Sequence, residues 1–165
     1  MKTTKLVPAF FAFAVCALIL KSFFDHSEPG YTFPDWEHGA SGYELALKEA
    51  EAKEAPLIVY FHTSWCSWCK KLDKNYLATD RGEEFLRNIP KVEINTDKGQ
   101  AEKNLFNKFG LSGTPSFLVF IPKLNTPPML ISPFLSSGNL TVEEFLAEIE
   151  RGITLAYKKG GIIKN

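Results

Sequence analysis

A pair of cysteines three residues apart, just after an apolar run, is the feature that most constrains this fold. Cys66 and Cys69 lie in "TSWCSWCKKLD", residues 63–73, which follows "LIVYFH", residues 57–62. A short apolar run rich in β-forming residues is typical of a strand buried on both faces. The residues after the cysteines continue as a helix, so the pair is predicted at the carboxyl end of a strand. Open α/β sheets place their functional sites there.

Predicted helices and strands alternate along the rest of the chain. Ser41 can cap a helix that Pro56 ends. Leu45, Leu47 and Ala50 are predicted to lie on its buried side. The other expected helices cover residues 81–88, 100–109 and 142–160, and the other expected strands cover residues 91–95, 116–121 and 129–134.

The order of these elements predicts an α/β fold, a three-layer sandwich with helices on both faces of a mixed sheet. The first two strands are expected to be parallel, with a right-handed crossover, and the last two antiparallel. Thr79 or Asp80 can cap the helix at 81–88, and Thr141 with Glu144 forms a capping box for the last helix. With 45% hydrophobic and 13% aromatic residues, the chain can fill such a core.

The N-terminal end carries a predicted membrane-targeting segment. Two lysines precede an apolar run over residues 6–20, which is the pattern of a signal peptide or a membrane anchor. No cleavage signal follows the run, so we expect residues 1–24 to be an uncleaved signal anchor, with a cleaved signal peptide as the alternative. Residues 25–40, rich in Pro, Gly and polar residues, are the expected linker to a folded domain at 41–165.

A cysteine pair of this spacing can bind a metal, form a structural disulfide or exchange disulfides. A zinc site needs two more ligands, but Cys16 lies in the apolar run and the three histidines are scattered. A structural disulfide would close almost no loop and would add little stability. Thiol–disulfide exchange remains, and it requires no metal or other cofactor beyond the Cys66–Cys69 disulfide.

The two cysteines are expected to differ in role. Cys66, in the first turn of the helix, lies near the exposed amides and the positive end of the helix dipole, which favours its thiolate and makes it the nucleophile. Cys69, one turn deeper, is suited to resolve a mixed disulfide. Trp65 is predicted beside the disulfide and Trp68 on the surface beside Cys69, both as contacts for partner proteins.

The motifs "YFHTSWCSWCK" and "GLSGTPSFLVF" resemble the thioredoxin superfamily over about residues 41–160. The "ALKEAEAKEAPLIVYF" lead-in, WCxxCK and Asp73 are most similar to extracytoplasmic proteins related to the C-terminal domain of DsbD-type thiol:disulfide interchange proteins. The resemblance implies a thioredoxin-like sandwich, Cys66 as nucleophile and Cys69 as resolving thiol. It also implies a cis peptide bond between Thr114 and Pro115, facing the disulfide and offering backbone to the substrate.

The sequence departs from that family at one site position. Typical thioredoxins carry a buried aspartate six residues before the first cysteine, where this chain has Tyr60. A phenol is a poor proton acceptor at neutral pH, so Tyr60 is a weak candidate for a proton relay. Asp73 or Glu93 is the alternative candidate, although we expect both to be ordinary exposed carboxylates. The dipeptide Ser67-Trp68 contains no histidine, which favours a reducing or intermediate potential.

These observations predict a protein-disulfide reductase that acts on protein thiols or disulfides outside the cytoplasm, in the periplasm and anchored to the inner membrane. A membrane electron donor would supply its electrons. A disulfide oxidase or isomerase is the alternative within this chemistry, and a binding or chaperone-like module is the alternative outside it. The 19 basic and 19 acidic residues balance without a basic cluster, so nucleic acid is not an expected partner.

Overall fold

The computed structural model describes residues 31–160. The predicted membrane segment, residues 1–24, lies outside the described residues. Within 31–160, no helix combines the length and apolar character needed to cross a membrane.

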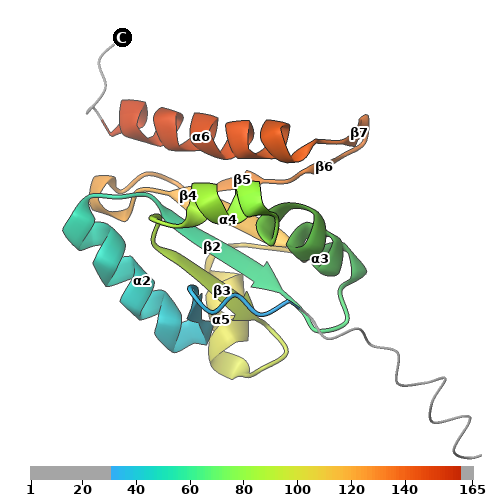
Figure 1. Cartoon of the computed structure of the whole chain (residues 1–165). Coiled ribbons are helices and arrows are strands. Elements are labelled where there is room, and N and C mark those ends of the chain that lie inside the picture. Colours follow the sequence, from blue (N-terminus) through green and yellow to red (C-terminus); the bar gives the residue numbers. More distant parts are fainter. Residues whose placement is uncertain (1–30, 161–165) are drawn as a thin grey trace, which may run out of the picture.

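Five strands form the middle layer of the fold. They are β1 (Glu37–His38), β2 (Leu57–His62), β3 (Lys91–Asn95), β4 (Ser116–Phe120) and β5 (Met129–Ile131). Their spatial order is β1-β3-β2-β4-β5, with β2 in the centre (Figure 1). As predicted, β2 is parallel to β3, and β4 is antiparallel to β5; β1 adds a further parallel pairing with β3.

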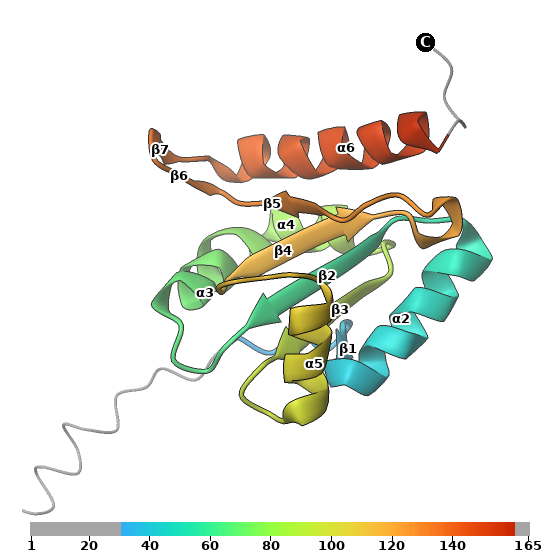
Figure 2. The same cartoon turned by 180° about the vertical axis from the view of Figure 1, so that it is seen from behind.

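Helices cover both faces of this sheet. They are α2 (Gly39–Lys53), α3 (Ser67–Leu72), α4 (Asp80–Leu86), α5 (Gln100–Lys108) and α6 (Val142–Lys159), with a π-helical turn η1 (Asp73–Leu77) after α3 and a 3-10 turn η2 (Pro122–Leu124) after β4. Figures 1 and 2 show α2 and α5 on one face and α3, α4 and α6 on the other. The predicted three-layer sandwich is therefore confirmed.

The central strand supplies both hydrophobic cores. Ile58 and Tyr60 point into the core under α3 and α6, whereas Leu57, Val59 and Phe61 point into the core under α2 and α5. This alternation follows from the period of two along a strand. Tyr60 consequently lies on the same side of the sheet as the helix that carries the cysteines.

The folded unit begins before residue 41, within the segment predicted as a linker. Phe33 and Trp36 are buried, and Trp36 packs edge-on against Tyr60 with ring centroids 6.4 Å apart. Strand β1 follows at once and pairs with β3.

The start of α2 differs from the prediction. His38 is its N-cap residue, and Ser41 lies inside the helix, so the predicted Ser41 cap is wrong. Because β1 holds His38 extended, Gly39 with its positive φ of 69° turns the chain directly into the helix. The helix buries Ala50 as predicted, but Leu45 is 56% exposed, so its predicted burial is wrong.

The last predicted strand is divided in two. Strand β5 ends at Ile131, and Phe134–Leu135 forms β6, which pairs with β7 (Gly138–Asn139) in a separate hairpin. Pro133 lies between β5 and β6 and has no N–H to continue a ladder. The predicted capping box at the start of α6 is confirmed, as is the Thr79 cap of α4.

Candidate active site

The two cysteines form a disulfide at the start of α3. Their Cα atoms are 5.2 Å apart. Cys66 is the N-cap of α3 rather than a residue of its first turn, and its Sγ accepts a hydrogen bond of 3.0 Å from the backbone N–H of Cys69. Cys66 is 5% exposed and Cys69 1% exposed. The predicted order of accessibility therefore holds, and the cap hydrogen bond favours negative charge on the Cys66 sulfur.

A polar network holds the loop between β2 and Cys66. The backbone N–H of Ser64 donates to the Asp97 carboxylate at 2.9 Å, and the Asn95 side chain donates to the Ser64 hydroxyl at 2.9 Å. Sequence reasoning missed Asp97. The available signal was its place just after the strand at 91–95, whose end meets the end of β2 at the same sheet edge.

A buried acid lies under the disulfide helix. Asp73 is 6% exposed, and its carboxylate accepts a hydrogen bond of 2.8 Å from the Tyr60 hydroxyl. The same hydroxyl lies 3.5 Å from the carbonyl oxygen of Cys69. Burial raises the pKa of Asp73 to about 7, although the Tyr60 hydrogen bond lowers it in part. The expectation of an exposed carboxylate at Asp73 is wrong, because Tyr60 provides its buried partner.

Two further titratable groups flank Tyr60. Glu93 lies opposite Tyr60 on β3, and its carboxylate is 2.9 Å from His38 Nδ1 on β1. Burial raises the pKa of Glu93, while His38 lowers it. The ring of His62 stacks on Tyr60 at 5.3 Å, and burial lowers the pKa of His62 to about 4. His62 is therefore neutral at neutral pH and brings no positive charge to the site.

The Thr114–Pro115 peptide bond is cis, as the family resemblance implied. Strand β4 begins directly after it, and Ser116 pairs with Phe61. Pro115 therefore lies level with the carboxyl end of β2, from which the loop to Cys66 leaves. Both residues are partly exposed. Because β4 runs antiparallel to β2, the start of β4 and the disulfide loop share one edge of the sheet.

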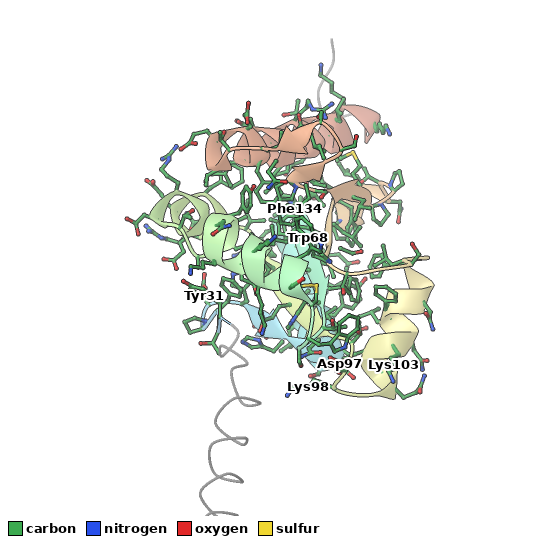
Figure 3. The ribbon with its side chains drawn as sticks, turned by 90° about the vertical axis from the view of Figure 1, so that its right-hand side faces the viewer. Tyr31, Trp68, Asp97, Lys98, Lys103 and Phe134 are labelled. Carbon is green, nitrogen blue, oxygen red and sulfur yellow. A yellow bond between two sulfur atoms is a disulfide. The ribbon has the colours of Figure 1, made fainter. Side chains whose placement is uncertain are left out.

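Two exposed tryptophans, Trp65 and Trp68, each precede one of the cysteines. Trp65 is 76% exposed and Trp68 is 47% exposed. Trp68 packs against Phe134 of the β6–β7 hairpin, with ring centroids 4.8 Å apart, and the Lys71 ammonium lies 4.1 Å from the centre of its ring. Figure 3 shows Trp68 and Phe134 side by side above the disulfide. The hairpin contact was not predicted from sequence.

The arrangement of the two sulfurs and one carboxyl suits a dithiol that is oxidised and reduced by two electrons at a time. One sulfur caps α3 and the second lies one turn deeper. The buried carboxyl of Asp73, whose pKa burial raises to about 7, lies on the turn that follows α3. Within residues 31–160, no group of three His, Cys, Asp or Glu side chains is arranged to hold a metal ion.

Comparison with protein families agrees with this site. The model of the thioredoxin-like domain family matches residues 43–123, a range that includes both cysteines and the cis proline. The thiol:disulfide interchange protein DsbD of Ralstonia nicotianae is 25% identical over 120 residues, which cover 72% of this chain and 19% of that protein. The chain thus spans about a fifth of the length of the curated relatives it matches.

Solved structures share the fold. The oxidised C-terminal domain of Neisseria meningitidis DsbD aligns with a TM-score of 0.55 and 18% identity, covering 70% of this chain and 97% of that domain. A thioredoxin from Thermus thermophilus aligns with a TM-score of 0.55 and 22% identity, covering 72% of this chain and 87% of the thioredoxin.

Proposed function

We infer that this chain, which belongs to the thioredoxin superfamily, is a thiol–disulfide oxidoreductase that works through Cys66 and Cys69. The observation that carries this function is the Cys66–Cys69 disulfide at the carboxyl end of β2, with the Cys66 sulfur capping α3. We propose further that the reaction runs in the reductive direction on extracytoplasmic protein disulfides.

The reductive reaction begins with the dithiol form. The Cys66 thiolate attacks one sulfur of a partner disulfide, and the other partner sulfur leaves as a thiolate and takes up a proton. Cys69 then loses its proton, and its sulfur attacks the Cys66 sulfur of the mixed disulfide. The second partner cysteine leaves and is protonated. Two electrons have moved to the partner, and the Cys66–Cys69 disulfide has formed.

Asp73 is the proposed group that takes the proton from Cys69. A carboxyl whose pKa is about 7 is divided between its protonated and ionised forms at neutral pH, as a proton relay requires. Burial and the nearby Asp73 charge raise the pKa of Tyr60 far above its usual value, so the phenol stays protonated and positions Asp73. Glu93, held by His38, is a second relay candidate.

The reductive direction rests on which groups could stabilise the thiolate. Strong oxidants of this kind hold their reduced form in an unusually stable state. Here the dipeptide Ser67-Trp68 contains no histidine, and His62 is neutral at neutral pH. The thiolate of Cys66 therefore gains little beyond its cap hydrogen bond, which supports a reducing or intermediate potential.

The proposal also covers where the protein acts and which proteins it contacts. Residues 1–24 would anchor the domain to the inner membrane with the site in the periplasm, and a membrane protein would return electrons to the disulfide. The sequence pattern of the N-terminal end and the similarity to DsbD proteins support this arrangement. Trp65, Trp68, Thr114 and Pro115, all partly or fully exposed around the disulfide, would contact the partner protein.

The reduction potential tests the direction. The protein would be equilibrated with glutathione or dithiothreitol buffers, and the dithiol fraction measured by thiol alkylation. We expect a value close to that of thioredoxin, about −270 mV. A value close to about −120 mV would identify an oxidant and would overturn the reductive proposal.

Trapping tests the chemistry itself. Without its resolving thiol, a Cys69→Ser variant should accumulate mixed disulfides between Cys66 and its partners. A Cys66→Ser variant is the control and should trap far less, because the remaining thiol of Cys69 is the less exposed of the two, at 1% against 5%, and lacks the cap position. If a double Cys→Ser variant kept full biological activity, the binding or chaperone-like module would be favoured instead.

A further inference from the structure

An apolar groove lies along the free edge of the sheet. Within residues 31–160, strand β5 is the last strand of the sheet order and pairs with β4 alone. The groove beside it has a volume of about 690 Å³. It lies between β5, the hairpin and α6, and we call it the β5 groove; its apolar lining residues are Met129, Leu130, Ile131, Leu135, Leu140 and Leu155.

Three leucines of the β5 groove are unusually exposed. Leu130 is 61% exposed, Leu135 47% and Leu155 38%. Exposed apolar side chains that gather in one hollow mark a binding surface, whereas isolated ones carry no such meaning. The two charged lining residues, Glu148 and Arg151, form an ion pair with each other on α6.

Gly152 on α6 shapes the floor of the β5 groove. A Cβ at this position would lie 3.1 Å from the end of Ile131 and 3.3 Å from the end of Met129. The glycine therefore lets the helix approach strand β5 closely. Met129 and Ile131 fill the space beneath the helix, and the outer edge of β5 stays open.

The β5 groove continues the apolar surface around the disulfide. Trp68, between the two cysteines, packs on Phe134, and the next residue, Leu135, lines the groove. Figure 3 shows Phe134 directly beyond Trp68 on the side of α6. A chain that reaches the disulfide and passes over Trp68 and Phe134 would next meet the groove.

We propose that the β5 groove binds an extended apolar segment of the partner protein, close in sequence to the cysteine that reacts with Cys66. This inference rests on the proposed function and names its substrate class. The open backbone edge of β5 can pair with an extended chain, and the exposed leucines can receive its alternate side chains. Three residues of β5 match a segment about 10 Å long. Continuity with the disulfide favours a reacting partner over a second copy of this chain.

Peptide disulfides of matched sequence test the proposal on the full chain. Each peptide carries one cysteine, joined to glutathione in a mixed disulfide. Within five residues of that cysteine, the apolar peptide has a run of Leu and Val and its polar match has a run of Ser and Gly. Both versions are made with the run before the cysteine and with the run after it. We expect kcat/KM for the better apolar peptide to exceed that for its polar match by about tenfold, the effect of burying one leucine-sized side chain. Glutathione disulfide is the substrate that cannot reach the groove.

A double variant, Leu130→Ser with Leu155→Ser, removes two of the exposed leucines without touching the disulfide. It should lose most of the preference for the apolar peptide and keep the wild-type rate with glutathione disulfide. Leu45→Ser is the matched control, because Leu45 is also exposed, at 56%, but lies on α2 across the sheet. This control should keep the full preference.

The results separate this inference from the proposed function. If the wild type reduces glutathione disulfide but shows no preference between peptides, or if the double variant keeps the preference, only the groove proposal is overturned. If the wild type reduces none of these disulfides, both proposals are overturned. If the double variant converts a dimer to a monomer with peptide preference unchanged, the groove binds a second copy of this chain and the proposal is wrong.

Discussion

Asp73 should make the stability of this protein depend on pH. Its pKa is about 7 in the folded protein, against an ordinary value of 3.8. The folded state therefore holds this proton more tightly than the unfolded state. The contribution of Asp73 to stability is thus fully present below about pH 4 and is lost as the pH rises through about 7. Relative to an Asp73→Asn variant, the wild type should lose roughly 2–4 kcal/mol of unfolding free energy across this range. Urea unfolding of both proteins from pH 4 to pH 8 measures the difference.

The comparison with Asp73→Asn isolates this group, because the asparagine oxygen can still accept the hydrogen bond from Tyr60 and all other titrating groups are shared. A difference that stays constant with pH would show that Asp73 is already ionised at pH 4. The carboxyl would then be unsuited to take a proton from Cys69 at neutral pH.

Tyr60 should hold the pKa of Asp73 down. Its hydroxyl donates to the Asp73 carboxylate at 2.8 Å, and this hydrogen bond favours the ionised form. A Tyr60→Phe variant leaves the carboxyl buried without that donor, so the pKa of Asp73 should rise further above about 7. Titration of the Asp73 carboxyl carbon by NMR measures it. An unchanged or lower pKa would mean that another donor fixes Asp73.

Site residues could be predicted from sequence where the signal is local. The spacing of Cys66 and Cys69 and the family pattern around Pro115 identified the disulfide and the cis bond. The burial of Asp73 depends on a hydroxyl thirteen residues earlier in the chain, on a different element. No local pattern shows that Tyr60 would reach it, so the sequence suggested an exposed carboxylate.

At the scale of elements, the turn from η1 into α4 depends on one glycine. A Cβ at Gly82 would lie 2.1 Å from the carbonyl oxygen of Tyr76 and 2.9 Å from that of Leu77. Both are backbone atoms, so a Gly82→Ala variant must shift the turn and should lose about 2–4 kcal/mol of unfolding free energy. Chemical denaturation measures the loss.

Gly113→Ala is the control for this substitution. A Cβ there would meet nothing within 4 Å, and its φ is not positive, so stability should change by less than about 1 kcal/mol. Equal effects of the two substitutions would mean that the close approach at Gly82 relaxes without cost.

Long elements were predictable from sequence, and short ones were not. Strand β2 and helix α6 have strong apolar patterns and clear boundaries, and both were found as predicted. Strands β1, β6 and β7 have two residues each, too few to show a period of two, and they form only because partner strands lie beside them. Because β1 extends His38, α2 begins there and not at the predicted Ser41 cap.

The whole molecule brings its functional groups to one end of the sheet. Strand β2 ends at the disulfide loop, β3 ends near Asp97, which holds that loop, and β4 begins after the cis proline. The opposite face, under α2 and α5, supplies a second core without a reactive group. One face of the sandwich therefore carries the reaction, and the free edge at β5 leads away from it.

The stability of the whole molecule should reveal the direction of electron flow. In a thermodynamic cycle, the oxidised and reduced forms differ in unfolding free energy by the difference in potential between the folded and unfolded dithiol, with 30 mV equal to about 1.4 kcal/mol. The Cys66 sulfur already accepts its one N–H hydrogen bond in the disulfide form, His62 brings no positive charge, and Asp73 lies buried nearby, so little in the site favours a thiolate over the disulfide. We therefore expect the oxidised protein to be at least as stable as the reduced protein at pH 7.

Urea unfolding with and without dithiothreitol measures this difference, and a double Cys66→Ser, Cys69→Ser variant controls for effects of the reductant itself. The variant should unfold at the same urea concentration in both conditions. If the reduced wild type were more stable by about 3 kcal/mol or more, its dithiol would be over 60 mV more oxidising than that of the unfolded chain. The folded protein would then favour giving its disulfide away, and the reductive direction would be wrong although the exchange chemistry would stand.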